Sequence, residues 1–301
     1  MARRFEVALP DGRVLEALEE GDPEGTLLVY HHGSPGAAVP YGPFDRLASE
    51  RGVRFASYSR PGFAGSSRHE GRTVADAAGD AAALADHLGA DRFLTLGWSG
   101  GGPHALACAA LLPERAMACA TIASIAPWGA EGLDWTAGMG ETNQVEYPLA
   151  ARDPDKLLEW IEEGSEWFAS AQAADLLGGM RSVVSDADRP FLDGELGEMV
   201  AATYREGYRI GIWGHYDDDL AFTRPWGFEL SSTRAPVSVW QGEQDLFVPF
   251  AHGRWLTDHV AGARAHLFPE EGHLSIGVGK LDAIVDDLLA AAGLTGGPAR
   301  R

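Results

Sequence analysis

In the first part of the chain, segments with a strand-like pattern of apolar positions alternate with segments that have a helix-like pattern. Short apolar runs of β type, such as residues 26–30, are separated by longer segments that carry apolar residues on one helical face. Before them, residues 5–18 alternate around Asp11-Gly12 and predict a β-hairpin. Because unbroken apolar runs are typical of strands buried on both faces, the pattern predicts an α/β fold with a mostly parallel sheet.

The same pattern assigns the remaining elements of this fold. Further strands are expected over residues 53–58, 93–96, 117–125, 236–240 and 265–268. Helices are expected over residues 43–51, 73–88, 103–112, 281–292 and a segment after Pro249. Thr73 is the expected N-cap of the second helix, since Asp76 follows at capping-box spacing. Strands and helices that alternate in this way predict helices on both faces of the sheet.

Residues 128–220 break this rhythm, because they show no convincing strand pattern. Asp153-Pro154 is typical of an N-cap followed by proline at the first helical position, and residues 195–212 form a second helical pattern. We therefore predict a helical cap over 128–220, inserted between core segments 1–127 and 221–294. Residues 295–301 are expected to form a disordered tail.

Charge and targeting signals narrow the possible partners. The chain has 301 residues and a formal net charge of −20, which disfavours binding to nucleic acid or to an anionic membrane. Residues 128–220 hold 20 acidic and 6 basic side chains, which indicates a solvated surface or, as the alternative, a field that attracts cationic substrates. The sequence contains no signal-peptide pattern and no apolar run that could span a bilayer. Cys108 and Cys119 fit buried free thiols, so a cytoplasmic location is expected.

One stretch, Gly97-Trp98-Ser99-Gly100-Gly101, joins an apolar run to an alanine-rich helical segment. Its G-x-S-x-G pattern is typical of a nucleophile elbow, in which glycines permit a sharp strand-to-helix turn that presents the serine hydroxyl. A glycine-rich loop that happens to contain a serine would look the same. The rest of the chain must therefore supply an acid and a base.

Two later loops supply them, because Asp245 and His273 each follow a predicted strand. With Ser99 they give the order Ser…Asp…His at the carboxyl edge of the predicted sheet. A neutral imidazole can take the proton of a serine hydroxyl, and a carboxylate fixes the tautomer of that imidazole. Asp245 could instead be a turn residue, in which case Glu243 is the fallback acid. His273 could be a surface-loop histidine.

The loop after the strand at 26–30 can supply an oxyanion hole. Gly33 permits an unusual turn and Pro35 has no N–H, so Ser34 is the residue whose backbone N–H we expect to point into the site. The N–H of Gly100 is the expected second donor. His32 is interpreted as a hydrogen-bonded structural histidine under this loop, and no metal site is predicted.

These motifs together resemble α/β-hydrolase fold enzymes of the capped, serine-nucleophile kind. The matching stretches are His32 to Gly36, Ser59 to Ser66, Gly97 to Gly101, Gly242 to Pro249 and Gly272-His273. Ser59 departs from the family, where aspartate often precedes Arg-Pro-Gly, and is interpreted as a structural change. Haloalkane dehalogenases and epoxide hydrolases of this family carry aspartate at the elbow. Ser99 therefore indicates acyl transfer to water.

The predicted function is a cofactor-free serine hydrolase that cleaves a small ester or related acyl compound. Its partner is expected to be a small-molecule substrate, and the oligomeric state is not predicted. Aromatic residues expected to line the substrate pocket are Trp98, Trp128, Trp135 and Phe247. The choice among ester, amide, lactone and carbon–carbon bond stays open.

Two alternatives remain. One is a proline-iminopeptidase-like aminopeptidase, since His32 to Gly36 partly resembles the H-G-G-P-G loop of that family. Its acidic cap could bind a free amino terminus through Glu141, Glu146 or Glu163. The other is a non-catalytic protein of this fold that binds a small ligand or a partner, although all three triad residues are present.

Overall fold

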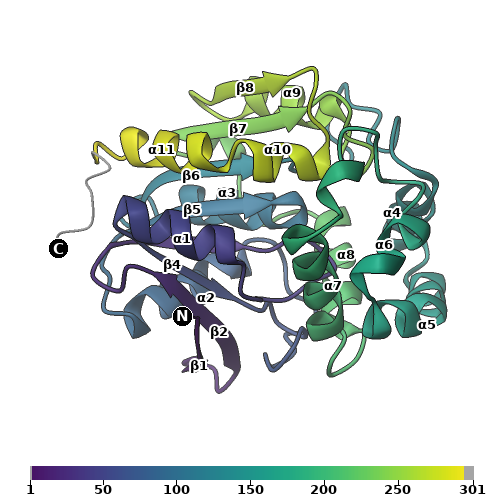
Figure 1. The fold of residues 1–301 in the computed structure, drawn as a ribbon, viewed down its shortest axis with the longest axis horizontal. Helices are drawn as coiled ribbons and strands as arrows, with labels where there is room; N and C mark the ends of the chain where they lie inside the picture. Colours follow the sequence, from purple (N-terminus) through teal and green to yellow (C-terminus); the bar gives the residue numbers. More distant parts are fainter. Residues whose placement is uncertain (1, 295–301) are drawn as a thin grey trace.

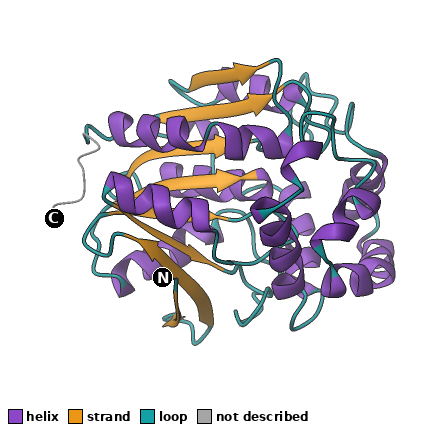
Figure 2. Ribbon diagram, viewed as in Figure 1, coloured by secondary structure: helices purple, strands orange, loops and turns teal. Residues whose placement is uncertain are grey.

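The computed structural model describes residues 2–294, which contain one eight-stranded sheet between layers of helices (Figures 1 and 2). The strands are β1 (Arg3–Ala8), β2 (Val14–Gly21), β3 (Thr26–His31), β4 (Val53–Tyr58), β5 (Phe93–Trp98), β6 (Ala116–Ile122), β7 (Val237–Gly242) and β8 (Arg264–Phe268). Their order is β1-β2-β4-β3-β5-β6-β7-β8. β2 is antiparallel to both of its neighbours, and all other neighbours are parallel. The predicted fold class is confirmed.

Helices cover both faces of this sheet. α1 (Gly42–Arg51) and α11 (Leu281–Ala291) share one hydrophobic cluster with β3, β4, β5 and β6. The other face is covered by α2 (Asp76–His87), α3 (Gly102–Leu111) and α9 (Phe250–His259). The alanines of α3 are buried, and their small side chains let this helix pack closely on β5 and β6 behind the serine turn.

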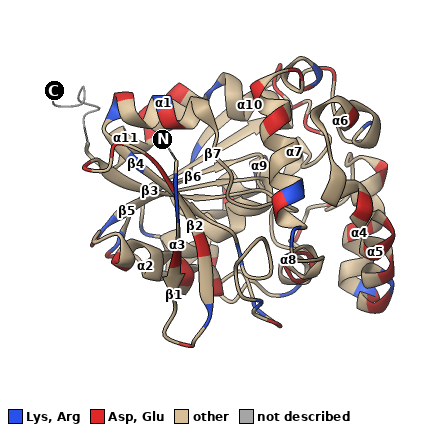
Figure 3. Cartoon of the chain, turned by 60° about the horizontal axis from the view of Figure 1, so that its bottom comes forward, with Lys and Arg blue, Asp and Glu red and all other residues tan. Residues whose placement is uncertain are grey.

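An inserted helical segment lies between β6 and β7, at the carboxyl ends of the parallel strands (Figure 1). Its helices are α4 (Glu141–Arg152), α5 (Pro154–Ser170), α6 (Ala173–Gly179), α7 (Glu195–Gly207) and α8 (Trp213–Thr223), with short 3₁₀ turns at Arg189–Phe191 and Leu230–Ser232. Residues 123–236 are all described and contain no strand, which agrees with the prediction for 128–220; the strand predicted over 117–125 ends earlier, at Ile122. Acidic side chains are frequent along α4 and α5 (Figure 3).

Several predicted boundaries in this insert differ from the structure. The helix predicted over 195–212 ends at Gly207. A turn follows, and Gly211, with a φ of 123°, separates it from α8, which begins at Trp213. The sequence pattern also missed α4, α6 and α8. The predicted cap boundary at Leu220 falls inside α8, and the division into domains stays a prediction.

Two elements of the core also differ. α2 begins at Asp76, whereas Thr73 was the expected N-cap. One bond of the expected capping box forms, from the Thr73 N–H to the Asp76 carboxylate (2.7 Å), but the Thr73 hydroxyl donates to the same carboxylate (2.9 Å) and does not accept a backbone N–H from any described residue. The short helix α10 (His273–Gly279) was not predicted, because serine and glycine within it are weak helix formers. The tail expected over 295–301 lies outside the described residues. None of the helices in 2–294 is long and apolar enough to cross a membrane.

Candidate active site

The serine turn follows directly from β5. Ser99 has a φ of 55°, a left-handed conformation that is strained for a residue with a side chain. A Cβ on Gly97 would overlap the carbonyl oxygen of Gly101, and a Cβ on Gly101 would overlap that of His31. The glycines are therefore required by close backbone packing. This geometry is a sharp strand-to-helix turn of the kind that the G-x-S-x-G pattern predicts.

His273 and Asp245 form a buried hydrogen-bonded pair. Asp245 lies on the loop after β7 and His273 is the first residue of α10, which follows β8, with His273 Nδ1 2.9 Å from Asp245 Oδ2. The other carboxylate oxygen, Oδ1, accepts hydrogen bonds from the N–H groups of Phe247 and Val248, both at 2.8 Å. Burial raises the pKa of Asp245, while the adjacent His273 opposes this effect. The carboxylate fixes the Nδ1–H tautomer and leaves Nε2 free to act as a base.

Ser99 and His273 line the same cavity. The ring of Phe247 stacks on that of His273 with centroids 4.4 Å apart, which restricts the orientation of the imidazole. Across residues 2–294, no hydrogen bond within the protein uses Nε2 of His273. The serine hydroxyl and an available imidazole nitrogen therefore border the space that a substrate would enter.

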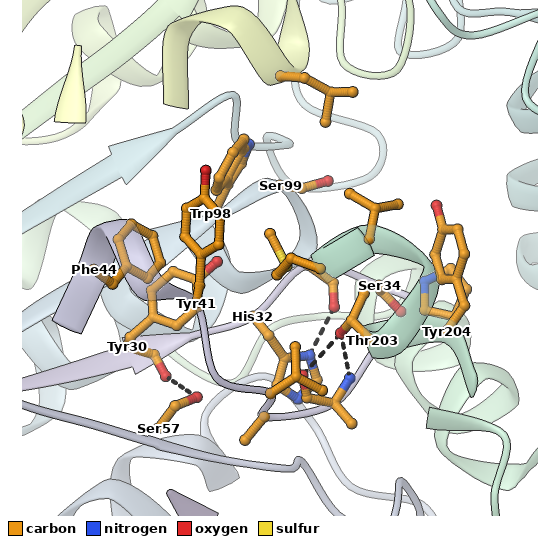
Figure 4. A pocket seen from close by; sticks show the side chains of 18 of the residues that line it. Tyr30, His32, Ser34, Tyr41, Phe44, Ser57, Trp98, Ser99, Thr203 and Tyr204 are labelled. Atoms are coloured by element: carbon orange, nitrogen blue, oxygen red, sulfur yellow. Dashed lines mark hydrogen bonds between the residues drawn. The ribbon is translucent and has the colours of Figure 1, made fainter. Parts of the chain in front are cut away.

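The cavity has two arms that meet at Ser34, Ser99 and Phe247. We call the first the aromatic arm; its lining includes Tyr30, Tyr41, Phe44, Phe55 and Trp98. Figure 4 shows Tyr30, Tyr41, Phe44 and Trp98 gathered on one side, with Tyr204 on the other. We call the second the acidic arm; its lining includes Thr142, Asn143, Glu146, Glu163 and His215. An apolar group and a polar group could therefore occupy different arms.

The loop predicted to form an oxyanion hole lies against the serine. A Cβ on Gly33 would sit 3.4 Å from the Cβ of Ser99, and a Cβ on Gly100 would sit 3.0 Å from the Cβ of Ser34. The backbones of Ser34 and Gly100 thus approach each other beside the Ser99 side chain. This proximity is what two converging N–H donors would require.

A buried ion-pair network holds this loop in place. The Arg60 guanidinium donates to the carbonyl of Gly33 (Nη2 to O, 2.9 Å) and to Asp218 Oδ2 on α8 (2.6 Å). Arg72 donates to the other Asp218 oxygen (2.7 Å), and the Ser34 hydroxyl donates to Oδ2 (2.7 Å). Burial alone would disfavour the ionised form, but the two guanidiniums hold the pKa of Asp218 well below its usual value. Asp218 therefore links helix α8 of the insert to the loop that carries Gly33 and Ser34.

His32 takes the structural role expected of it. Its Nε2 accepts the backbone N–H of Arg60 (3.1 Å), so Nδ1 carries the proton that is donated to the carbonyl of Gly33 (2.8 Å). Burial and the charge of Arg60 lower the pKa of His32 well below its usual value. Sequence reasoning identified the Arg60 stretch as a motif, but it did not identify Asp218 as its partner.

A second polar cluster lies at the acidic arm. His215 is buried, with Nε2 2.6 Å from Glu146 Oε1 and Nδ1 2.5 Å from the Tyr208 hydroxyl. Burial, followed by the charge of Glu146, raises the pKa of Asp219 well above its usual value. Ligand atoms of Glu146, His215 and Asp219 lie within 4.8 Å of one another and could hold a metal ion. Both nitrogens of His215 already have hydrogen-bond partners in the absence of a metal ion.

The predicted pocket residues divide into two groups. Trp98 and Phe247 line the cavity, as predicted. Trp128 and Trp135 line neither arm, which corrects the prediction. Trp135 is 5% exposed, and its indole N–H donates to the carbonyl of Ala126 (2.8 Å), so it fills the core beside Trp128 instead.

The acidic residues proposed from the sequence also differ in whether they line the cavity. Glu146 and Glu163 line the acidic arm, whereas Glu141 is exposed and lines neither arm of the cavity. Glu243, the fallback acid, is exposed, and Asp245 is the carboxylate that bonds His273. Cys108 and Cys119 are buried free thiols, as expected.

A mostly parallel sheet with a serine at a sharp strand-to-helix turn defines an α/β hydrolase architecture. A family model for the alpha/beta hydrolase fold matches residues 26–280, so the chain belongs to this family. It is 26% identical to the uncharacterized hydrolase YcgS of Bacillus subtilis (strain 168), over 96% of this chain and 98% of the relative. The pimeloyl-[acyl-carrier protein] methyl ester esterase of Nitrosomonas europaea is 28% identical over 63% of this chain and 67% of its own.

A solved structure supports the same architecture. An alpha/beta hydrolase fold protein from Nakamurella multipartita shares 25% identity, with a TM-score of 0.63 over 97% of this chain and 100% of its own. The family and these relatives support hydrolase activity for the chain.

Proposed function

We propose that the protein hydrolyses a small carboxylic ester or a related acyl compound through an acyl-enzyme on Ser99. His273 Nε2 takes the hydroxyl proton as Ser99 Oγ attacks the carbonyl carbon, and the resulting oxyanion accepts hydrogen bonds from the N–H groups of Ser34 and Gly100. The imidazolium then protonates the leaving alcohol. A water molecule, deprotonated by His273, attacks the acyl-enzyme, releases the acid and restores the serine.

The observation that carries this proposal is the Asp245–His273 bond at a cavity that Ser99 also lines. Asp245 stabilises the imidazolium that forms during attack. Each oxyanion donor is expected to contribute about 3 kcal/mol. The similarity to a relative named as a methyl ester esterase supports an ester as the substrate.

The lining of the cavity indicates what kind of ester fits. The aromatic arm would enclose an apolar substituent, and the acidic arm would accept a group that donates hydrogen bonds. His273 lines the aromatic arm, where it could protonate a leaving group. The proposed substrate is therefore a small ester with an apolar alcohol portion.

Turnover of p-nitrophenyl esters of increasing acyl length tests this function, with Ser99→Ala as the control. We expect hydrolysis by the wild-type protein and loss of at least about 10³-fold in the variant. Equal rates for the two proteins would contradict the proposal.

A second candidate is the aminopeptidase, which Glu146 and Glu163 favour because they line the acidic arm. Comparing prolyl naphthylamide with p-nitrophenyl acetate separates the two activities. Ligand-induced stabilisation that persists in Ser99→Ala, with no turnover of either substrate, would favour the non-catalytic alternative. The cytoplasmic location also stays a prediction, supported by the two free thiols.

A further inference from the structure

One carboxylate from the inserted segment is bonded to the backbone of the proposed base. Asp188 precedes the 3₁₀ turn Arg189–Phe191 and is 0% exposed. Its Oδ2 accepts the N–H of His273 (3.0 Å), and its Oδ1 accepts those of Leu274 (2.8 Å) and Ser275 (2.9 Å). These are the first three residues of α10. A single side chain therefore fixes the backbone on which the imidazole stands.

The carboxylate is itself held in place. The Ser185 hydroxyl donates to Asp188 Oδ2 (2.9 Å), and the Asp188 N–H donates to the same hydroxyl oxygen (3.3 Å). A Cβ on Gly272 would lie 2.5 Å from both Asp188 oxygens and from Ser185 Oγ, so residue 272 has no space for a side chain. This contact gives a physical reason for the glycine of the Gly272-His273 motif. Four donated hydrogen bonds replace the water that a buried carboxylate would otherwise need.

We propose that Asp188 is a positioning residue for the proposed hydrolysis: its three backbone hydrogen bonds hold His273 where Nε2 can exchange protons with Ser99 and the substrate. The inference rests on the proposed function. Asp245 constrains the ring through Nδ1, whereas Asp188 constrains the main chain, so the two carboxylates fix different parts of the same residue. The inserted segment therefore takes part in the chemical step, in addition to covering the cavity.

Asp188→Asn tests this role, because it keeps the shape of the side chain but replaces one accepting oxygen with an amide NH₂. Loss of the bond to His273 lets the imidazole drift, and a displacement of about 1 Å can reduce the rate by about 100-fold. We therefore expect kcat for a p-nitrophenyl ester to fall about 30- to 100-fold with KM within about twofold of wild type.

Two further variants make the test specific. Asp186→Asn is the matched control, since the Asp186 side chain is 92% exposed and pairs only with Arg189 (3.3 Å); its kcat should equal that of wild type. Ser185→Ala removes one bond to Asp188 and keeps the carboxylate, so a decrease of about threefold to fivefold is expected. It also replaces Asp188→Asn in the test if that variant does not fold. Thermal melts establish that each variant is folded at the assay temperature.

The outcomes separate the two hypotheses. A folded Asp188→Asn with wild-type kcat overturns the positioning role, even if its melting temperature is lower. If Asp188→Asn does not fold, a wild-type kcat for Ser185→Ala overturns it. If the wild-type protein turns over none of the esters, the proposed function fails, and the positioning role fails with it.

Discussion

Two buried histidine–carboxylate pairs border the same cavity, one on the core and one on the insert. In the core pair, His273 is bonded through Nδ1 to Asp245 (2.9 Å), and Nε2 is left to the cavity. In the insert pair, His215 is bonded through Nε2 to Glu146 (2.6 Å) and through Nδ1 to Tyr208 (2.5 Å). Only the core histidine has a nitrogen free for proton transfer. The chemistry of such a pair therefore depends on whether the nitrogen that is not bonded to the carboxylate stays free.

The groups that surround the two pairs also differ. The Asp245 carboxylate accepts hydrogen bonds from backbone N–H groups as well as from His273, which keeps an ionised form satisfied inside the protein. Near His215 a second carboxyl, Asp219, is present, and burial and the charge of Glu146 raise its pKa well above its usual value. The core pair can stabilise a transient positive charge, whereas both nitrogens of the insert histidine are already hydrogen-bonded.

Replacing the histidine of each pair by alanine should give the largest difference between the two pairs in kcat and in stability. His273→Ala removes the base and should lower kcat by at least about 10³-fold with little loss of stability. His215→Ala should leave kcat within about threefold but reduce the free energy of unfolding by about 2–4 kcal/mol, because Glu146 and Tyr208 lose their partner. Ester kinetics and urea unfolding of both variants measure this difference. Similar losses of kcat would contradict the contrast.

Replacing the carboxylates by amides should give a smaller contrast. Asp245→Asn preserves size but permits the wrong imidazole tautomer, so kcat should fall by about 10³-fold or more. Glu146→Gln removes charge from the acidic arm, so it should change KM for amine-bearing substrates and leave kcat for p-nitrophenyl acetate within about fivefold. A larger effect of Glu146→Gln than of Asp245→Asn on acetate turnover would reverse our assignment of the two pairs.

The smallest expected effect is a pH-dependent change in stability at Asp219. Its folded pKa is raised above the model-peptide value of 3.8, so the folded state binds the proton more tightly than the unfolded state. Its contribution to stability is therefore present below pH 3.8 and decreases as pH rises from there toward the folded pKa. Asp219→Asn mimics the protonated form and should stabilise the protein by about 1 kcal/mol at neutral pH. Urea unfolding should show this gain at pH 7 and not near pH 3.5; a pH-independent difference would contradict it.

The core and the insert also differ in how much the sequence could predict. Ser99, Asp245 and His273 each follow a strand with a local motif, so their shared edge follows from topology. The partners that fix them cannot be obtained in this way. Asp188 lies 85 residues before His273, and Asp218 lies 184 residues after Ser34. Neither carboxylate has a local pattern that distinguishes it from the other acidic residues of the insert.

The insert also shows what the presence of an aromatic residue in the sequence leaves undecided. Tryptophan in a cap segment can line a cavity or fill the core, and Trp135 fills the core because its ring packs against Tyr147 and His252. Helix α8 was missed because Asp217, Asp218 and Asp219 give it a polar sequence, although all three are buried. Arg68 pairs with Asp217, and Arg60 and Arg72 pair with Asp218; hydrophobic periodicity does not record these ion pairs.

Covalent labelling tests the central claim, that Ser99 is the nucleophile, most directly. The wild-type protein is treated with an organophosphonate and its intact mass and peptide masses are measured, with Ser99→Ala and His273→Ala treated in parallel. Our account predicts one adduct per chain on the peptide that contains Ser99, no adduct in Ser99→Ala and much slower labelling in His273→Ala. An unchanged wild-type mass under conditions that label a control esterase, or an adduct on another residue, would contradict it.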